Sequence, residues 1–507
     1  MAQTATEPPA LDNDALVDTI DPRSLVEPRS ADAILDELAD ELRTYDPARD
    51  LANQAAALDD ALRAAAENID SEVEVERIVA SFISDRAEPF RAIIAQTVAN
   101  HPDVRAALSR QSQADETVIE TRSALRPLVS AGIRSTASQF NGADDDLDGQ
   151  LRGDGFTVEA DAFIRFRQVL FDGGAGRFDL RAARLEAEAA RFDQLGAVGQ
   201  ITLEAIQAYF QVLGFQIVLD LSQVHVAQLE AVRDQVQERY ELGGSTLSDL
   251  ARADADLADA RTRLSASRQR LAEAQADYLS VFGAPAGRLS LPPPPASLPN
   301  DIDRAVELAL IDAPAQRAVR AQLRAAEQNR KAERARGGPS VLFEGNALKF
   351  DLFEDNDAFG VTGRVIASYN LFESGARRAR TRRAQSVVDE ALHQAEATAR
   401  DIEREARVAY RNVQSLIAER ASAQLAARAN EEARVVTLEQ FKLIGGDLLT
   451  VLNAEINAHL SATTWVETLV NLEISRYRLL AATAGVGAYF DLSALEAAVA
   501  QWESERD

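Results

Sequence analysis

Leu170–Ala175 (LFDGGA) recurs as Leu371–Ala376 (LFESGA), so positions 170 and 371 open two similar stretches 201 residues apart. A second pair keeps the same separation, because Tyr240–Leu247 (YELGGSTL) corresponds to Phe441–Leu448 (FKLIGGDL). A repeat at a fixed spacing constrains the architecture more strongly than any single motif does. The sequence therefore predicts two copies of one structural unit, in residues 88–290 and 301–487, joined by a Pro-rich linker at 291–300.

The composition predicts long helices and argues against several classes of function. Only 25 of the 507 residues are Gly and 16 are Pro, which suits helices better than many small domains. The net charge of −27 argues against nucleic acid as a partner, since phosphate binding needs a basic surface. There is no Cys, and the four His (101, 225, 393 and 459) are dispersed. We therefore expect no catalytic residue, no metal site and no cofactor, and no enzyme activity.

No stretch reads as a transmembrane helix. The most apolar candidate, Phe210–Leu221, contains Gln211, Gln216 and Asp220, and a helical span needs roughly 18 apolar residues. Any membrane crossing is thus expected to use strands. The first residues lack the features of a signal peptide. A mature exported protein and a cytosolic protein would both look like this, so the point does not decide between them.

Each copy contains one predicted β-hairpin whose second strand alternates apolar and polar residues. The alternation covers Phe156–Phe166 in the first copy and Phe359–Leu371 in the second, as in a sheet with one apolar face. The preceding strands are expected at about 128–140 and 340–350. Polar loops at 141–155 and 354–358 close the hairpins, and Asp144–Asp148 is expected to be a solvated loop tip rather than a cation site.

Helices are expected on both sides of each hairpin. A helix over about 90–125 should end at Pro127, because proline lacks a backbone N–H, and Pro339 marks the same point in the second copy. Long helices are expected from about 175 to 242 and from 376 to 443, each about 100 Å long. Each should reverse at a glycine pair and return along a seam that in the first copy includes Leu250, Leu257, Leu264 and Leu271.

One chain supplies only four strands, which leave two open edges. Unpaired backbone groups are not tolerated in lipid, so several chains would be needed to close a barrel. Two chains would give eight strands and three would give twelve; a wide lumen favours three, although the sequence alone leaves this open. Outside the repeats, residues 1–87 form an acidic N-terminal extension and 488–507 a predicted C-terminal helix.

These features resemble the TolC family of Gram-negative outer membrane channels over roughly residues 88–490. The resemblance rests on Asn100-His101-Pro102, on both Leu-Phe-x-x-Gly-Ala strand ends and on both aromatic-x-x-Gly turns. It implies a mainly α fold with a membrane β-barrel: a homotrimer whose 12-stranded barrel, four strands per chain, continues as an α-helical coiled-coil tunnel. It also implies outer membrane lipid, a periplasmic adaptor protein and an inner-membrane ABC or proton-driven pump as partners.

The resemblance predicts a passive exit duct. Type I protein secretion is favoured slightly, because no Cys is available for lipidation, and multidrug or small-molecule efflux is the alternative. A soluble coiled-coil scaffold is the rival of another class; it accounts for the heptads but not for the two hairpins.

The helix tips are the first candidate site. The tip turns are expected to contact the adaptor as well as to reverse the helices; they comprise Leu242, Gly243, Gly244, Ser245, Leu443, Ile444, Gly445 and Gly446. TolC-like tips often carry an acidic ring, and at the second-repeat positions that would hold it this chain has Thr450 and Asn453. The nearby Asp249 and Asp447 either line the entrance or cap the returning helices.

The second candidate site lies where strands meet helices. The predicted barrel–helix junction comprises Pro127, Gly173, Gly174, Pro339 and Gly375. Residues expected at the periplasmic membrane interface are Phe171, Arg177, Phe372, Arg377 and Arg378, the arginines reaching lipid headgroups. A solvated helix face and ordinary packing are the alternatives for these side chains.

Overall fold

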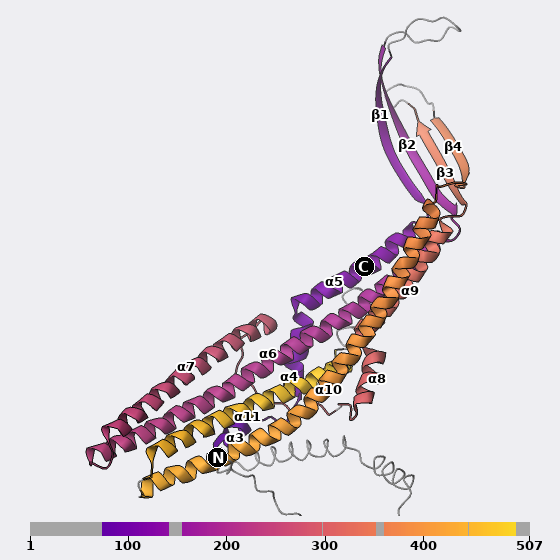
Figure 1. The fold of residues 1–507 in the computed structure, drawn as a ribbon. Coiled ribbons are helices and arrows are strands. Elements are labelled where there is room, and N and C mark those ends of the chain that lie inside the picture. Colours follow the sequence, from indigo (N-terminus) through magenta and orange to yellow (C-terminus); the bar gives the residue numbers. More distant parts are fainter. Residues whose placement is uncertain (1–73, 141–154, 297, 351–358, 445, 493–507) are drawn as a thin grey trace, which may run out of the picture. The chain divides into compact units, whose positions relative to one another are not determined.

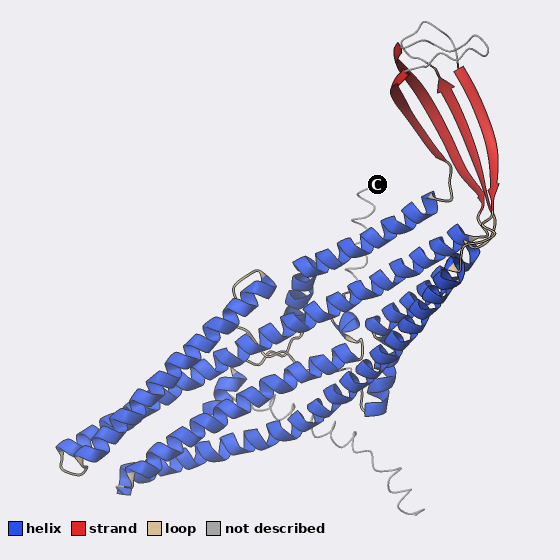
Figure 2. Ribbon diagram, turned by 45° about the horizontal axis from the view of Figure 1, so that its top comes forward, coloured by secondary structure: helices blue, strands red, loops and turns tan. Residues whose placement is uncertain are grey.

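The computed structural model describes residues 74–140, 155–296, 298–350, 359–444 and 446–492 (Figure 1). All of them belong to one compact unit, Ala57–Asp507. Residues 1–73 of the expected N-terminal extension, the two hairpin loops and the C-terminal helix beyond residue 492 lie outside the described residues. Figure 2 shows a sheet at one end of this unit, with helices running away from the end of the strands.

Four antiparallel strands form the sheet in the order β1-β2-β3-β4. They are β1 (Leu128–Phe140), β2 (Gly155–Phe171), β3 (Ser340–Lys349) and β4 (Phe359–Ser368). The central pair, β2 and β3, joins the two sequence copies. Among the described residues, the outer edges of β1 and β4 have no neighbouring strand, so the prediction of four strands with two open edges is confirmed.

The two faces of the sheet differ in polarity. Alternate residues of a strand point to opposite faces, and directly opposed residues share a face. The register therefore places Val129, Ile133, Ile164, Phe343, Val361 and Val365 on one face. The other face carries Arg134, Asp161, Arg165, Arg167, Glu344 and Arg364. The predicted alternation is confirmed within the described strands, except that β4 ends at Ser368 and leaves 369–371 outside the sheet. The register between β2 and β3 shifts at Val169–Phe171, which places Phe171 opposite Val341 and on the apolar face.

The first copy contains α4 (Glu88–Asn100), α5 (Pro102–Ser123), α6 (Ala175–Glu241) and α7 (Leu247–Phe282). The second contains α8 (Ile302–Asp312), α9 (Pro314–Ala335), α10 (Ala376–Ile444), α11 (Leu448–Ala482) and the short α12 (Val486–Tyr489). The single helix expected over 90–125 is wrong. It divides at His101, whose ring caps α5 through the Asp103 N–H, and Pro102 cannot continue a helical hydrogen-bond ladder. Pro314 divides α8 from α9 in the same way.

The core lies where α6 and α11 cross and α4 packs beside them. Phe90, Tyr209, Phe210, Tyr477 and Phe490 form one cluster of neighbouring rings, all of them buried. Helix α6 is long and apolar enough to cross a membrane, contrary to the expectation that no helix would be. However, 56% of its most apolar 18-residue segment is buried inside the protein. The helix therefore behaves as the central helix of the bundle.

The end of the expected N-terminal extension belongs to this core. Helix α3 (Glu74–Ala80) buries Val75 and Val79, and Phe82 follows it into the same cluster. Glu76, 5% exposed, pairs with Arg428 of α10 at 2.9 Å. The end of the acidic N-terminal extension, from residue 74, therefore packs against the helices. The sequence did not predict this packing, because it depends on contacts with distant residues.

Candidate functional site

The first tip turn is built by a glycine and a capping box. At the end of α6, Gly243 has φ +75°, a conformation that glycine adopts without strain. Its N–H donates to the Tyr240 carbonyl, and the Gly244 N–H donates to the Arg239 carbonyl at 2.7 Å. Thr246 then begins α7: the Asp249 N–H donates to its hydroxyl at 3.1 Å, and its own N–H donates to the Asp249 carboxylate at 2.9 Å. This reciprocal pair satisfies donors that the helix start leaves open.

Asp447 caps the returning helix of the second copy. Its carboxylate accepts hydrogen bonds from the Thr450 N–H at 3.3 Å and from the Thr450 hydroxyl at 3.0 Å. Capping is therefore the observed role of both acids, and Thr450 takes part in the second cap. Hydrogen bonds from the backbone and side chain of Thr246 hold the pKa of Asp249 below its usual value. Asp447 and Asn453 are both exposed at the tip of the second copy.

The tip turns expose apolar side chains. Leu242 and Leu443 are each 80% exposed, and Leu247 is 65% exposed. Ser245 is half-buried, Gly446 is exposed, Ile444 ends α10, and Gly445 lies outside the described residues. Two exposed leucines at equivalent positions of the repeat give each tip an apolar surface of the kind that marks protein–protein contact sites.

Arg239 of α6 contacts α10 and so joins the two tips, although no pattern near it in the sequence predicts this contact. Its guanidinium donates to the Phe441 carbonyl of α10 and lies 4.1 Å from the centre of the Phe441 ring. Phe441 is buried, in a cluster with Val236, Leu448 and Leu452. Tyr240 and Phe441 are equivalent positions of the two copies. The residue that contacts Phe441 is Arg239, which precedes Tyr240.

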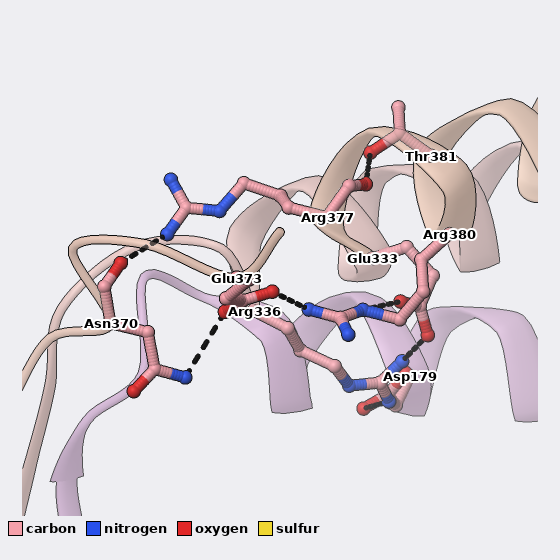
Figure 3. Close-up of polar contacts among 8 residues, drawn as sticks. All are labelled: Asp179, Glu333, Arg336, Asn370, Glu373, Arg377, Arg380 and Thr381. Atoms are coloured by element: carbon pink, nitrogen blue, oxygen red, sulfur yellow. Dashed lines mark hydrogen bonds and ion pairs between the residues drawn. The ribbon is translucent and has the colours of Figure 1, made fainter. Parts of the chain in front are cut away.

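At the other end of the helices, acidic residues in corresponding positions close both strand-to-helix turns. The Asp172 carboxylate accepts from the N–H groups of Gly174 at 2.8 Å and Gly176 at 2.7 Å, and so caps α6. In the second copy, Glu373 accepts from the Asn370 side chain at 3.0 Å and from Arg380 (Figure 3). These two contacts hold the pKa of Glu373 below its usual value. The Asp/Glu match within the repeat was the sequence signal that could have found both residues.

Each predicted junction residue lies in a segment between a strand and a helix. Gly173, Gly174 and Gly375 have φ of +69°, +88° and +85°. A Cβ on Gly173 would lie 3.0 Å from the Ala335 carbonyl at the end of α9, so this position requires glycine for space as well as for conformation. Pro127 and Pro339 stand immediately before β1 and β3.

The arginines of this region divide into two groups. Arg336 pairs with Asp179 of α6 at 2.7 Å, and Arg380 of α10 lies 3.9 Å from Glu333 of α9, so these ion pairs link the three helices (Figure 3). Arg377 donates to the Asn370 carbonyl at 2.9 Å within the turn that leads into α10. By contrast, Arg177 and Arg378 are exposed and have no ion-pair partner among the described residues. Phe171 and Phe372 are exposed beside them, at 51% and 85%.

The comparisons with known proteins agree with this architecture. A family described as outer membrane efflux protein matches residues 93–284. Over these residues the chain is similar to outer membrane efflux proteins, in agreement with the resemblance that the repeated motifs predicted. The outer membrane efflux protein BepC of Brucella suis biovar 1 (strain 1330) is 22% identical over 372 residues, which cover 73% of this chain and 79% of BepC.

Two solved structures of outer membrane proteins have the same fold as this chain. The Campylobacter jejuni CmeC outer membrane channel superposes with a TM-score of 0.69 at 15% identity, covering 79% of this chain and 86% of CmeC. The outer membrane protein VceC of Vibrio cholerae gives 0.67 at 18% identity, covering 78% of this chain and 96% of VceC. The TolC-like fold class, the outer membrane location and the role of an efflux channel rather than an enzyme are confirmed.

Proposed function

We propose that three copies of this chain form one exit duct of an export machine. The observation that carries the proposal is the four-stranded sheet with an apolar face and two open edges. In lipid both edges must be paired, and β4 of one copy can pair with β1 of the next until the sheet closes. Twelve strands make a barrel wide enough for an open lumen, with the apolar face toward lipid and the polar face inward.

The helices would continue the barrel as a tunnel. Helices α6 and α10 are 67 and 69 residues long, which is about 100 Å at 1.5 Å per residue. The exposed Phe171 and Phe372 would lie at the periplasmic edge of the membrane, with Arg177 and Arg378 at headgroup level and Arg377 behind them. The tips, with Leu242 and Leu443, would dock a periplasmic adaptor protein, and Asp249 and Asp447 would stand at the entrance. An inner-membrane pump would supply the energy.

The duct is proposed to serve small-molecule efflux, because both the matching family and BepC are described as efflux proteins. Type I secretion, the expectation from the sequence, would use the same duct. Deleting the gene in its host separates the two. Retention of a fluorescent dye such as ethidium supports efflux, whereas normal dye export with loss of one polypeptide from the medium supports secretion.

The assembly is tested by the mass of the purified protein in detergent. Light scattering corrected for bound detergent should give three chains of 55.0 kDa, about 165 kDa, and the protein should insert into planar bilayers as a conducting pore. A monomer that stays dispersed without detergent would contradict the proposal. For the tips, the double variant Leu242→Ser/Leu443→Ser should lose dye export while remaining trimeric. Leu279→Ser, an exposed leucine at the far end of α7, is the matched control and should export normally.

A further inference from the structure

The polar face of the sheet is richer in positive charge than the rest of this acidic chain. Its described side chains include four arginines and two acids, a net charge of +2 in a protein whose net charge is −27. These residues are Arg134, Arg165, Arg167, Arg364, Asp161 and Glu344. Composition alone would predict the opposite sign, so the excess is a property of this face.

One row across the sheet holds two guanidinium groups and a single carboxylate. The register sets Arg167 of β2, Glu344 of β3 and Arg364 of β4 directly opposite one another. Nε and Nη2 of Arg364 donate to one Glu344 oxygen at 2.9 and 2.6 Å. Arg167 has no hydrogen bond or ion pair of its own in the part of the chain that the structure describes. A single carboxylate cannot neutralise both groups, so this row keeps a positive charge.

Two more arginines are held in place by an aromatic ring. The Cζ atoms of Arg165 and Arg134 lie 5.3 and 5.6 Å from the centre of the Phe163 ring. Phe163 itself covers Gly132, where a Cβ would approach the ring to 2.8 Å. Cation–π contacts orient guanidinium groups without neutralising their charge. From Arg134, opposite Asp161, to the row at Arg167 the arginines extend about 20 Å along β2.

We propose that these arginines form an anion-attracting zone in the lumen of the barrel, and that the exported substrates carry carboxylate or phosphate groups. The inference rests on the proposed function, which turns this face inward and brings three copies of the zone around one lumen. Guanidinium groups bind carboxylates and phosphates in forked, bidentate geometry. Charges of one sign lining a cleft with low-dielectric walls raise the local concentration of the opposite ion.

The test is the ion selectivity of the purified full-length protein in planar bilayers under a KCl gradient. The triple variant Arg165→Gln/Arg167→Gln/Arg364→Gln should lower the chloride-to-potassium permeability ratio by at least about twofold, because charge lining a lumen sets the local ion concentration. The matched control replaces the same three residues with Lys, which keeps the charge, and should leave the ratio unchanged. If the Gln variant does not fold, Arg165→Gln alone removes a guanidinium that has no ion-pair partner among the described residues, and it should shift the ratio in the same direction.

The outcomes are distinguishable. An unchanged ratio in a conducting Gln variant overturns the inference and leaves the duct intact, whereas absence of any current from the wild type overturns the proposed function itself. In cells, the Gln variant should retain carboxyfluorescein, an anion, and export ethidium, a cation, normally. Equal export of both dyes by wild type and variant would contradict the assignment of anionic substrates.

Discussion

Replacing Val365 with Arg should prevent stable insertion of the sheet into a membrane. Val365 lies on the apolar face of β4, is 63% exposed and stands three residues before the strand ends at Ser368. Three residues span about 10 Å along a strand, or about 8 Å of height when the strand is tilted by about 40°. A membrane barrel has an apolar band about 25 Å tall, so Val365 lies within about 5 Å of its middle.

The magnitude follows from this depth. An arginine on the lipid face costs about 2–4 kcal/mol at the midplane and less toward the interfaces, so we expect about 2–3 kcal/mol per chain, and about three times that in a closed trimer. Thr362→Arg is the matched control, because Thr362 lies on the opposite face of the same strand, where Arg364 is already accommodated.

The measurement is the urea concentration at which each variant in liposomes loses its folded, heat-sensitive band on SDS gels. Val365→Arg should shift that midpoint to lower urea or fail to insert, while Thr362→Arg should stay close to the wild type. Equal midpoints for the two variants would refute the assignment of the faces. Complete solubility of both without detergent would favour the coiled-coil scaffold.

Three further predictions concern the helices. Gly214→Leu should lower the free energy of unfolding by about 1–3 kcal/mol, because a Cβ at this position would lie 2.9 Å from Cγ2 of Val470. In thermal melts the control Gly196→Ala, with no atom within 4 Å of its new Cβ, should be neutral or slightly stabilising. Acid should destabilise the bundle, because burial lowers the pKa of His225 to about 3 and that of His459 to about 4, their rings stacked 4.5 Å apart. The neutral forms are favoured in the folded state, so stability is full above about pH 6.5 and declines as the pH falls toward 4, by on the order of 2–3 kcal/mol. His225→Phe should flatten the dependence of the melting temperature on pH, and an unaltered slope would contradict this. Arg239→Ala should increase amide hydrogen exchange at both tips, because it removes the contact with Phe441, whereas an increase confined to residues 236–246 would mean that the tips are not coupled.

Much of the architecture was predictable from local signals. Period-two alternation located the sheet, because lipid and water on opposite faces demand opposite side chains. Gly173, Gly174, Gly375, Pro127 and Pro339 marked the ends of elements, because φ and a missing N–H are properties of single residues. The division of the first helix at Pro102 followed the same rule and was missed, because its spacing resembled a continuous helix.

Other features depended on residues far apart in the chain. Nothing near Glu76 or Val79 indicates that they pack against α6 and α10, and nothing near Arg239 indicates Phe441, 202 positions away. The ion pairs of Arg336 with Asp179 and of Arg380 with Glu333 likewise depend on how α9, α6 and α10 converge near the sheet.

The sequence by itself determined the duplication, the strands with one apolar face, the long helical hairpins and the positions of their turns, because each is written in periodicity or in the backbone chemistry of single residues. Only the tertiary structure decided which distant partners the buried and interhelical polar groups find, as when Arg428 pairs with Glu76 and Arg239 contacts Phe441. Those outcomes depend on distances of a few ångströms between segments that the sequence separates by hundreds of residues. The physical reason is that hydrogen bonds and ion pairs depend on short distances in space, whereas hydrophobic periodicity depends only on the order of residues along the chain.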